Sequence, residues 1–355
     1  MKRRQRIVDL LELAVPEQPA LSPDAATCAY VLRTADAETD KPVRALWCLG
    51  IPEGEPRQLT RGPSDSSPAW APDGGAIAFL RSSDAPSQVW LLPAHGGEPE
   101  QLTTLPLGAG APVWSPDGSR IAFAAPVDPH ASAGEDDGAR LRRGAEPIVA
   151  DRLSYQADGA GFLRTVRKHL FVLDPGTRDC RQLTRGDWHS GDPAWSPDGK
   201  KLAFAAATAP DADLTPRAPV FVVDVEVDSD ATEPEPVGLL DGVAGPVTWA
   251  PDGSAQLVVG WTGDPIGHAG LLRLPADGGA PVDLTAQLDR NVMPGGPAYP
   301  GALPQIAGDD RTVLFCVRDR GCTHLYSVPI DGGSPARTDV SAVELQHGRL
   351  GLTGS

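Results

Sequence analysis

The residues of this chain that could do chemistry are seven histidines, scattered serines, and aspartates that recur in one short pattern. A serine nucleophile of the hydrolase type needs a G-x-S-x-G turn that exposes its hydroxyl at the end of a strand. The segments "GPSDSS" (62–67) and "GGSPA" (332–336) both lack the last glycine. None of the histidines has metal-ligand spacing. We therefore predict no catalytic residue, no metal site and no cofactor.

The recurring aspartates belong to Pro-Asp-Gly steps. Taken singly, each could serve as a general acid. Their recurrence favours a structural role, because proline fixes φ, aspartate bonds to nearby backbone, and glycine accepts positive φ. Each step therefore predicts a tight turn between two strands. The aspartates concerned are Asp73, Asp117, Asp198 and Asp252.

The turn is part of a longer repeat, of which "PVWSPDGSRIAFA" (112–124) and "PAWSPDGKKLAFA" (193–205) are the clearest copies. The tryptophan ends an inner strand, and the apolar run after the turn is a buried strand. A second hairpin follows in most units, as in "HLFVLDPGTRDCRQLT" (169–184). Units of roughly 40–50 residues with four short antiparallel strands are propeller blades. A degenerate sixth copy, "QIAGDDRTVLFCV", occupies residues 305–317.

The predicted fold is all-β, a β-propeller of four-stranded antiparallel blades with a short N-terminal helix. The helix and lead-in occupy residues 1–18, the propeller 19–340, and residues 341–355 begin a further, seventh blade or form a tail. The helical spacing of Ile7, Leu10, Leu11 and Ala14 predicts a helix that packs on the domain. The six recognisable blades span 19–60, 68–103, 111–184, 193–239, 246–285 and 303–338.

The third blade carries a long insertion, residues 126–167. Its second half, "DRLSYQADGAGFL" (151–163), mixes aromatic, charged and glycine residues and is expected to be ordered. We predict that it shapes a substrate path; the alternative is a hairpin that only covers the rim. Arg152 could bind a peptide carboxylate or carbonyl, or pair with Glu146. Glu146 and Asp151 could meet a substrate amine or only add surface charge. The remaining gating candidates are Tyr155 and Asp158.

Composition narrows the function classes. The net charge of −16 argues against nucleic-acid binding through a basic face. No apolar run approaches the roughly 20 residues of a membrane span, and Asp9 and Glu12 interrupt the apolar part of the N-terminus. The five cysteines are scattered, so we expect reduced thiols and a cytoplasmic protein. Cys316 and Cys322 could face each other across a hairpin.

Three segments carry a family resemblance: "LTRGPSDSSPAWAPDGGAIAFLR", "DRLSYQADGAGFLRTVRKHLFVLD" and "RQLTRGDWHSGDPAWSPDGKKLAFAA". They resemble the N-terminal propeller of the prolyl-oligopeptidase-type serine peptidases (family S9), in the acylaminoacyl-peptidase and dipeptidyl-peptidase branch. The resemblance covers nearly the whole chain. TolB-like propellers of WD40-like (PD40) repeats share the single repeat, whereas the insertion is more specific.

The resemblance implies a partner, an α/β-hydrolase domain that carries Ser, Asp and His and is absent from this chain. The propeller would cap that domain and admit only short peptides. The family propeller usually has seven blades, and this chain stops where a seventh would begin. It is then a peptidase fragment, a truncated gene product or a free-standing six-bladed propeller.

Two further functions compete with gating: a free-standing TolB-like or WD40-like interaction scaffold, and an enzyme with its own site on the propeller. The expected partners are the hydrolase domain and short peptides, with no nucleic acid and no membrane. Homo-oligomer formation is left open.

Overall fold

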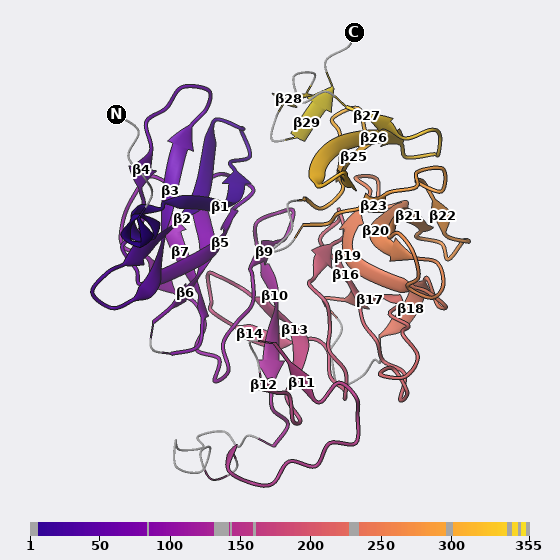
Figure 1. Ribbon diagram of the computed structural model, residues 1–355, viewed down its shortest axis with the longest axis horizontal. Helices are drawn as coiled ribbons and strands as arrows, with labels where there is room; N and C mark the ends of the chain where they lie inside the picture. Colours follow the sequence, from indigo (N-terminus) through magenta and orange to yellow (C-terminus); the bar gives the residue numbers. More distant parts are fainter. Residues whose placement is uncertain are drawn as a thin grey trace.

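The computed structural model describes residues 6–83, 85–130, 142, 144–158, 161–226, 234–295, 301–338, 343–346 and 349–352. Four-stranded antiparallel units follow one another around the molecule in sequence order. In Figure 1 they run from indigo on the left, through magenta below, to orange and yellow on the right. The predicted all-β propeller is confirmed.

The first five units each begin with the inner strand that leads into the repeat turn and end with a short outer strand, whereas the sixth has five strands because β23 pairs with β25 ahead of the repeat. The strands are β1 (Val15–Leu21), β2 (Thr27–Asp36), β3 (Lys41–Gly50) and β4 (Arg57–Gln58) in the first unit; β5 (Ser64–Trp70), β6 (Ala76–Ser82), β7 (Gln88–Pro93) and β8 (Glu100–Gln101) in the second; β9 (Val113–Trp114), β10 (Ile121–Val127), β13 (Arg167–Leu173) and β14 (Cys180–Gln182) in the third. They continue with β15 (Ala194–Trp195), β16 (Lys201–Ala205), β17 (Val220–Asp224) and β18 (Glu235–Gly238) in the fourth; β19 (Val243–Trp249), β20 (Ala255–Trp261), β21 (Gly270–Pro275) and β22 (Val282–Asp283) in the fifth; β23 (Asn291–Val292), β24 (Gln305–Ile306), β25 (Thr312–Asp319), β26 (Cys322–Pro329) and β27 (Ala336–Arg337) in the sixth.

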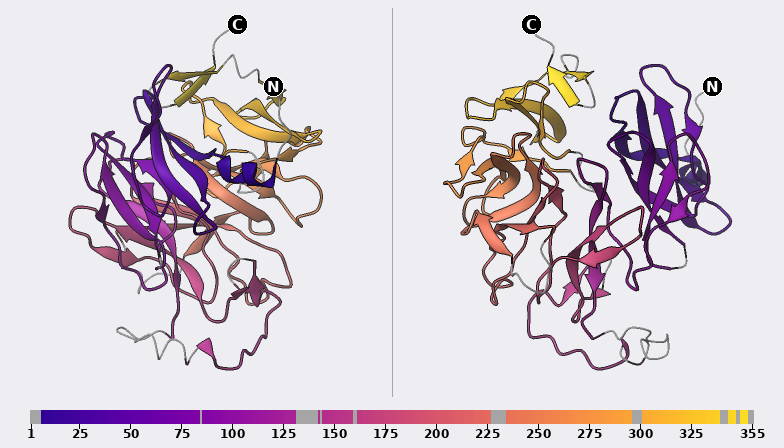
Figure 2. Two further views of the ribbon diagram at one scale, coloured as in Figure 1. Left: turned by 60° about the vertical axis from the view of Figure 1, so that its left-hand side comes forward. Right: turned by 180° about the vertical axis from the view of Figure 1, so that it is seen from behind.

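The described residues outside these units include two hairpins and a 3-10 helix. Strands β11 (Gln156–Ala157) and β12 (Gly161–Phe162) pair within the insertion, and β28 (Val343–Gln346) pairs with β29 (Arg349–Leu352) near the C-terminus. Figure 2 shows the β28–β29 hairpin beyond the sixth unit. A 3-10 helix, η1 (Ile7–Glu12), precedes β1. No helix in the described ranges is long and apolar enough to cross a membrane.

The core lies between neighbouring blades. The phenylalanine of the repeated apolar run is fully buried in four blades, at Phe79, Phe123, Phe204 and Phe315. Phe123 packs with Ala78 and Leu80 of the preceding blade. Because each twisted sheet can cover only its neighbour, burial is a series of interblade layers rather than one central core.

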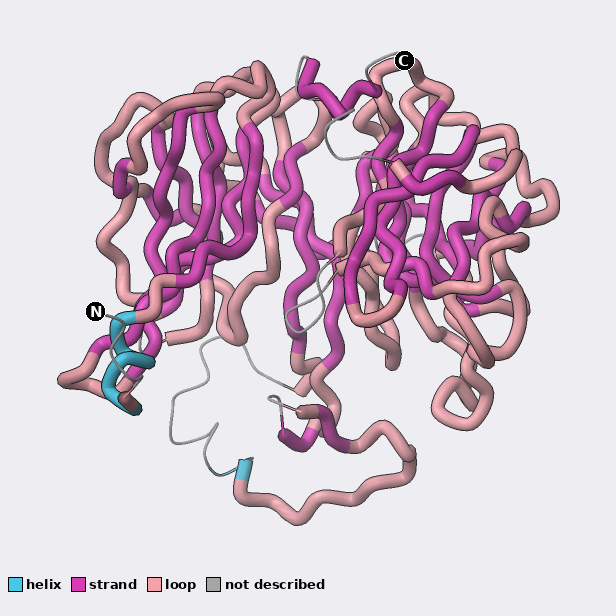
Figure 3. Tube along the Cα trace, turned by 45° about the horizontal axis from the view of Figure 1, so that its top comes forward, coloured by secondary structure: helices cyan, strands magenta, loops and turns pink. Residues whose placement is uncertain are grey.

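Alternation of strand direction gives the ring two faces. The Pro-Asp-Gly turns between first and second strands, and the turns between third and fourth strands, lie at one end, here called the turn face. The connections between second and third strands, and those between blades, lie at the other end, here called the connection face. The insertion and η1 therefore share the connection face, and Figure 3 draws both toward the bottom.

Two local expectations are wrong. The helix η1 buries none of its residues, and Ile7 is 88% exposed. In a 3-10 helix residues three apart share a face, so Ile7 with Leu10 and Val8 with Leu11 form two adjacent apolar faces, and both stay exposed although η1 lies beside β2. Cys316 lies opposite Leu325, and Cys322 lies opposite Asp319, so the two thiols do not face each other across the β25–β26 hairpin.

Candidate functional site

Tryptophans link successive blades at the inner strands. The indole N–H groups of Trp70, Trp114, Trp195 and Trp249 donate to the backbone carbonyls of Ala20, Ala69, Val113 and Ala194, at 3.1, 3.0, 2.9 and 3.1 Å. Each acceptor belongs to the inner strand of the preceding blade. The predicted burial holds for Trp195, whereas the other three indoles are half-buried.

All four tryptophans border a central cavity of about 1060 Å³. Its wall alternates these four tryptophans with prolines of the repeat, such as Pro72, Pro116 and Pro197. Because the indole N–H groups are already bonded to backbone, the rings present mainly apolar surface to the cavity. The cavity can therefore contact a polypeptide segment through its shape and apolar surface more readily than through hydrogen bonds.

The recurring aspartates form turns, as predicted. The carboxylate of Asp117 accepts hydrogen bonds from the Ser115 hydroxyl at 2.6 Å and from the Ser119 backbone N–H at 3.0 Å. These bonds favour the charged form and lower the pKa of Asp117 to about 2. A carboxylate held ionised in this way is a poor general acid near neutral pH.

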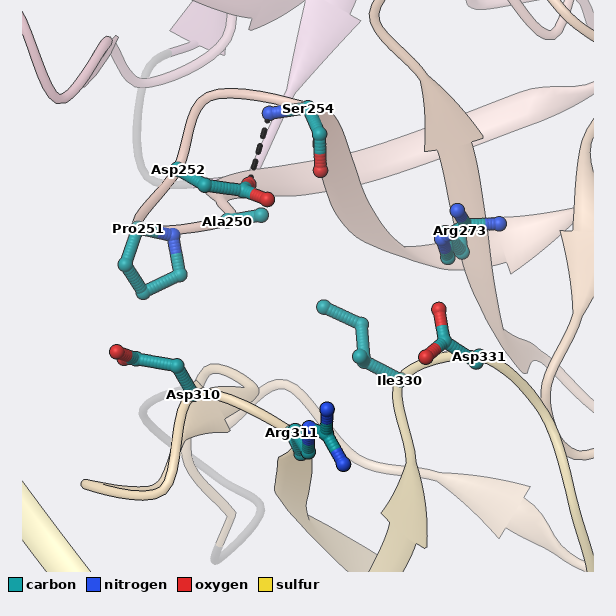
Figure 4. A pocket seen from close by; sticks show the side chains of 9 residues that line it. All are labelled: Ala250, Pro251, Asp252, Ser254, Arg273, Asp310, Arg311, Ile330 and Asp331. Atoms are coloured by element: carbon teal, nitrogen blue, oxygen red, sulfur yellow. Dashed lines mark hydrogen bonds between the residues drawn. The ribbon is translucent and has the colours of Figure 1, made fainter.

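The turn glycine also joins neighbouring blades. Gly118 has φ of +73°, and a Cβ on it would lie 3.5 Å from Cδ of Pro72 in the preceding turn. In the sixth blade Asp310 takes the glycine position with φ of +55°. A pocket of about 370 Å³ lies beside this degenerate turn, between the fifth and sixth blades. Figure 4 shows Asp252, Asp310 and Asp331 there, with Arg273 and Arg311.

The insertion brings three of the five predicted gating residues to one cavity. Glu146, Asp151 and Arg152 line a space of about 1170 Å³ on the connection face. Arg152 pairs with Asp187 rather than with Glu146: its Nη2 lies 2.7 Å from the Asp187 carboxylate, and its Nη1 donates to the Asp187 carbonyl at 3.1 Å. The other two candidates, Tyr155 and Asp158, do not line this cavity.

Tyr155 instead belongs to the hairpin that extends the insertion. Its ring stacks on Phe162 with 6.2 Å between centroids. The hairpin is tied to the next blade, because the backbone N–H of Leu153 donates to the Asp213 carboxylate at 2.7 Å. The second half of the insertion therefore contacts two connections of the ring, at Asp187 and at Asp213.

Sequence reasoning missed the basic residues that complete this cavity. Arg167 reaches Asp187 at 2.8 Å, so this carboxylate holds two guanidinium groups. Arg164 donates to the Gly144 carbonyl at 2.7 Å within the insertion. The signal in the sequence was the run of basic residues that leads into the third strand, "LRTVRKH" (163–169).

His169 is the most perturbed titratable group of the cavity. It is almost fully buried, its Nε2 lies 3.1 Å from the Gly186 carbonyl, and its ring meets Trp188 edge-on. Burial, with nearby cationic groups, lowers the pKa of His169 to about 4. The ring is therefore neutral at pH 7 and packs as part of the cavity wall.

Exposed large apolar side chains gather on the connection face. They are Ile7, Val8, Leu10, Leu11 and Leu13 in and beside η1; Ile148, Val149, Leu153, Tyr155 and Phe162 in the insertion; and Leu214, Leu240 and Ile266 in other connections. Among the described residues, the remaining exposed large apolar side chains are Ile51 and Val282, in or beside turns between third and fourth strands, and Leu303, which lines the central cavity. Such concentration on one face is typical of an interaction surface.

Known proteins share this architecture. No protein-family model matches the chain. It is 29% identical over 210 residues to "Uncharacterized peptidase YuxL" of Bacillus subtilis, covering 58% of this chain and 32% of that protein. The acylaminoacyl peptidase of Pyrococcus horikoshii superposes with a TM-score of 0.68 at 17% identity, over 94% of this chain and 47% of that chain. The propeller domain of the Trilobed protease from Pyrococcus furiosus, whose structure is described as an open velcro topology, gives 0.59 at 15% identity, over 94% and 85% of the two chains.

The chain thus spans about one third of the peptidase relative and about half of the acylaminoacyl peptidase. Together with the fold, these likenesses support a β-propeller domain of the S9-peptidase type.

Proposed function

We propose that this propeller caps an α/β-hydrolase domain of an acylaminoacyl-peptidase-like or dipeptidyl-peptidase-like serine peptidase and restricts access to it. The hydrolase domain would supply the nucleophile, base and oxyanion site. The propeller would select substrates by size through its central cavity and by charge through the insertion. The peptidase names among its relatives support this reading.

The observation that carries the proposal is the apolar connection face. Exposed side chains there, such as Val149 at 88% and Ile266 at 82%, would leave water when a partner domain covers them. The cavity of the insertion lies on the same face, so a domain seated there would receive substrates beside Arg152. The N-terminal η1 would pack against that domain, which accounts for its exposed apolar residues.

Charge at the insertion would select peptide ends. Arg152 shares Asp187 with Arg167, and a substrate carboxylate or carbonyl could take the place of one of these contacts. Glu146 and Asp151 supply carboxylates to the same cavity and would attract a peptide amine. Tyr155 and Asp158 would act at a distance, by holding the hairpin against the partner domain.

We also propose that the propeller extends over residues 19–340, with residues 1–18 as lead-in and 341–355 as the start of a further blade or a tail. We further propose a cytoplasmic location. All five cysteines carry free thiols, as is usual in a reducing compartment.

The test joins this chain to the hydrolase domain that the proposal expects to be encoded beside it. kcat/KM is measured for short and long peptides with the unaltered propeller, with residues 126–167 replaced by a short linker, and with Arg152→Ala. We expect short and long substrates to respond by different factors. Arg217→Ala is the matched control, because Arg217 makes a similar 2.7 Å pair with Asp264 on the same face but outside the cavity.

Two outcomes contradict the proposal. One is a neighbouring gene region without a hydrolase domain, which would favour the interaction scaffold. The other is an intact fusion in which all substrates keep their relative rates after Arg152→Ala and after the deletion.

A further inference from the structure

A second, smaller cavity lies where the third, fourth and fifth blades meet. Its volume is about 420 Å³, which is within the size range of small-molecule sites. It adjoins the central cavity, because Asp192 and Pro246 line both. This cavity is separate from the one beside Arg152, since the two share no lining residue.

The wall of the cavity is built from small residues. Ala205, Ala207 and Ala218 supply methyl groups. A Cβ on Gly191 would lie 3.0 Å from the Ala205 carbonyl oxygen, and one on Gly245 would lie 2.7 Å from that of Val259. Close backbone approach therefore keeps both glycines free of side chains, and the space beside them stays open.

One polar group in this wall has no partner. Ser190 is 4% exposed, and its hydroxyl makes no hydrogen bond to any described residue. Asp65 holds the equivalent position in the second blade, where the opposite residue Arg81 binds it at 2.7 and 2.9 Å. In the fourth blade the residue opposite Ser190 is Ala206, which offers no polar side chain. A buried hydroxyl without a partner is costly, but its oxygen exposes almost no surface, so a ligand in the cavity meets the alanine and glycine wall rather than this hydroxyl.

Groups of both charges border the same space. Lys168 of β13 and Asp192, in the residues before β15, are charged residues that line it. Nδ1 of His189 accepts the Lys168 backbone N–H at 3.2 Å, so the neutral ring carries its proton on Nε2. Burial and the cations of Arg167 and Lys168 lower the pKa of His189, which keeps the ring neutral at pH 7.

We propose that this cavity binds a free α-amino acid with a small side chain. The ligand ammonium binds the Asp192 carboxylate. The ligand carboxylate binds the Lys168 ammonium and the Nε2–H of His189, and the side chain packs against the alanines. The inference goes beyond the gating function, because it assigns a ligand to the propeller alone.

The test is calorimetric titration of the intact chain with L-alanine, N-acetyl-L-alanine and L-alanine amide. Acetylation removes the ammonium and amidation removes the carboxylate, so each derivative loses one charged contact. We expect L-alanine to bind and each derivative to bind at least about tenfold more weakly, as after loss of a hydrogen bond to a charged group. Asp192→Asn should weaken L-alanine binding by a similar factor.

Two further variants complete the test. Asp241→Asn makes the same charge change in the next connection on the same face, outside the cavity, and should leave binding unchanged. Ser190→Ala should leave both L-alanine binding and the melting temperature close to those of the unaltered chain, because it removes a covered hydroxyl that has no protein partner. No binding of L-alanine, equal binding of the derivatives, or unchanged binding by Asp192→Asn would each overturn the proposal.

Discussion

Trp195 should be the tryptophan on which blade packing depends most. Its side chain is 8% exposed within the layer between the third and fourth blades, and its indole N–H bonds the Val113 carbonyl at 2.9 Å. Trp195→Ala removes the ring and leaves a cavity, at a cost of about 3–5 kcal/mol in the free energy of unfolding. Trp195→Phe keeps most of the ring but leaves the carbonyl without its donor, at a cost of about 1–3 kcal/mol.

The assay is reversible urea unfolding followed by far-ultraviolet circular dichroism, which does not depend on the substituted fluorophore. Trp249→Ala is the matched control, because Trp249 makes the same kind of bond, to Ala194 at 3.1 Å, but is only half-buried. Its loss should be smaller than that of Trp195→Ala. A loss below about 1 kcal/mol for Trp195→Ala, against the expected 3–5, would refute the packing argument.

Three further predictions concern the scaffold. Burial lowers the pKa of His169 from 6.5 to about 4 in the folded protein, so the folded ring stays neutral where the unfolded one takes up a proton. The free energy of unfolding should therefore be highest above pH 6.5 and should fall by up to about 3 kcal/mol as the pH drops toward 4. Unfolding curves across this window should show that slope, and His169→Gln should flatten it. Gly199→Ala should cost about 1–2 kcal/mol because its φ is +69°, whereas Gly263→Ala, at an unstrained and open position, should cost little; equal losses in urea unfolding would contradict this. Asp65→Asn should lower the free energy of unfolding by about 3–5 kcal/mol, since it leaves Arg81 without its buried partner; a thermal melt unchanged from that of the original chain would show that the pair contributes nothing.

The fold could be predicted because the repeat is local and physically explicit. A proline, an aspartate and a glycine in sequence specify a reversal, and an apolar run of strand length follows each one. The turn role of Asp117 and the blade identity of "PVWSPDGSRIAFA" both depend on contacts within a few residues. Even the degenerate sixth copy could be recognised, because Asp309 still bonds the backbone N–H groups of Arg311 and Thr312.

The site was predicted only in part. The sequence indicated that the insertion mattered, and it placed Glu146, Asp151 and Arg152 among the candidates. It suggested Glu146 as the partner of Arg152, whereas the structure provides Asp187 from a connection between blades. Nothing in local spacing distinguishes those two acids, because Asp187 is 35 residues away along the chain and adjacent only in the folded ring.

By itself, the sequence determined the unit of this protein: four strands, a Pro-Asp-Gly turn, and an aromatic residue at the end of the inner strand. Tertiary structure alone decided what the units make together. Each indole bonds a carbonyl of the preceding blade, and Asp187 gathers Arg152 and Arg167 from different elements. The physical reason is the distance along the chain over which each kind of interaction acts. Turn chemistry and strand periodicity act over a few residues, whereas charge pairing, cavity shape and the apolar face depend on which distant segments the ring brings side by side.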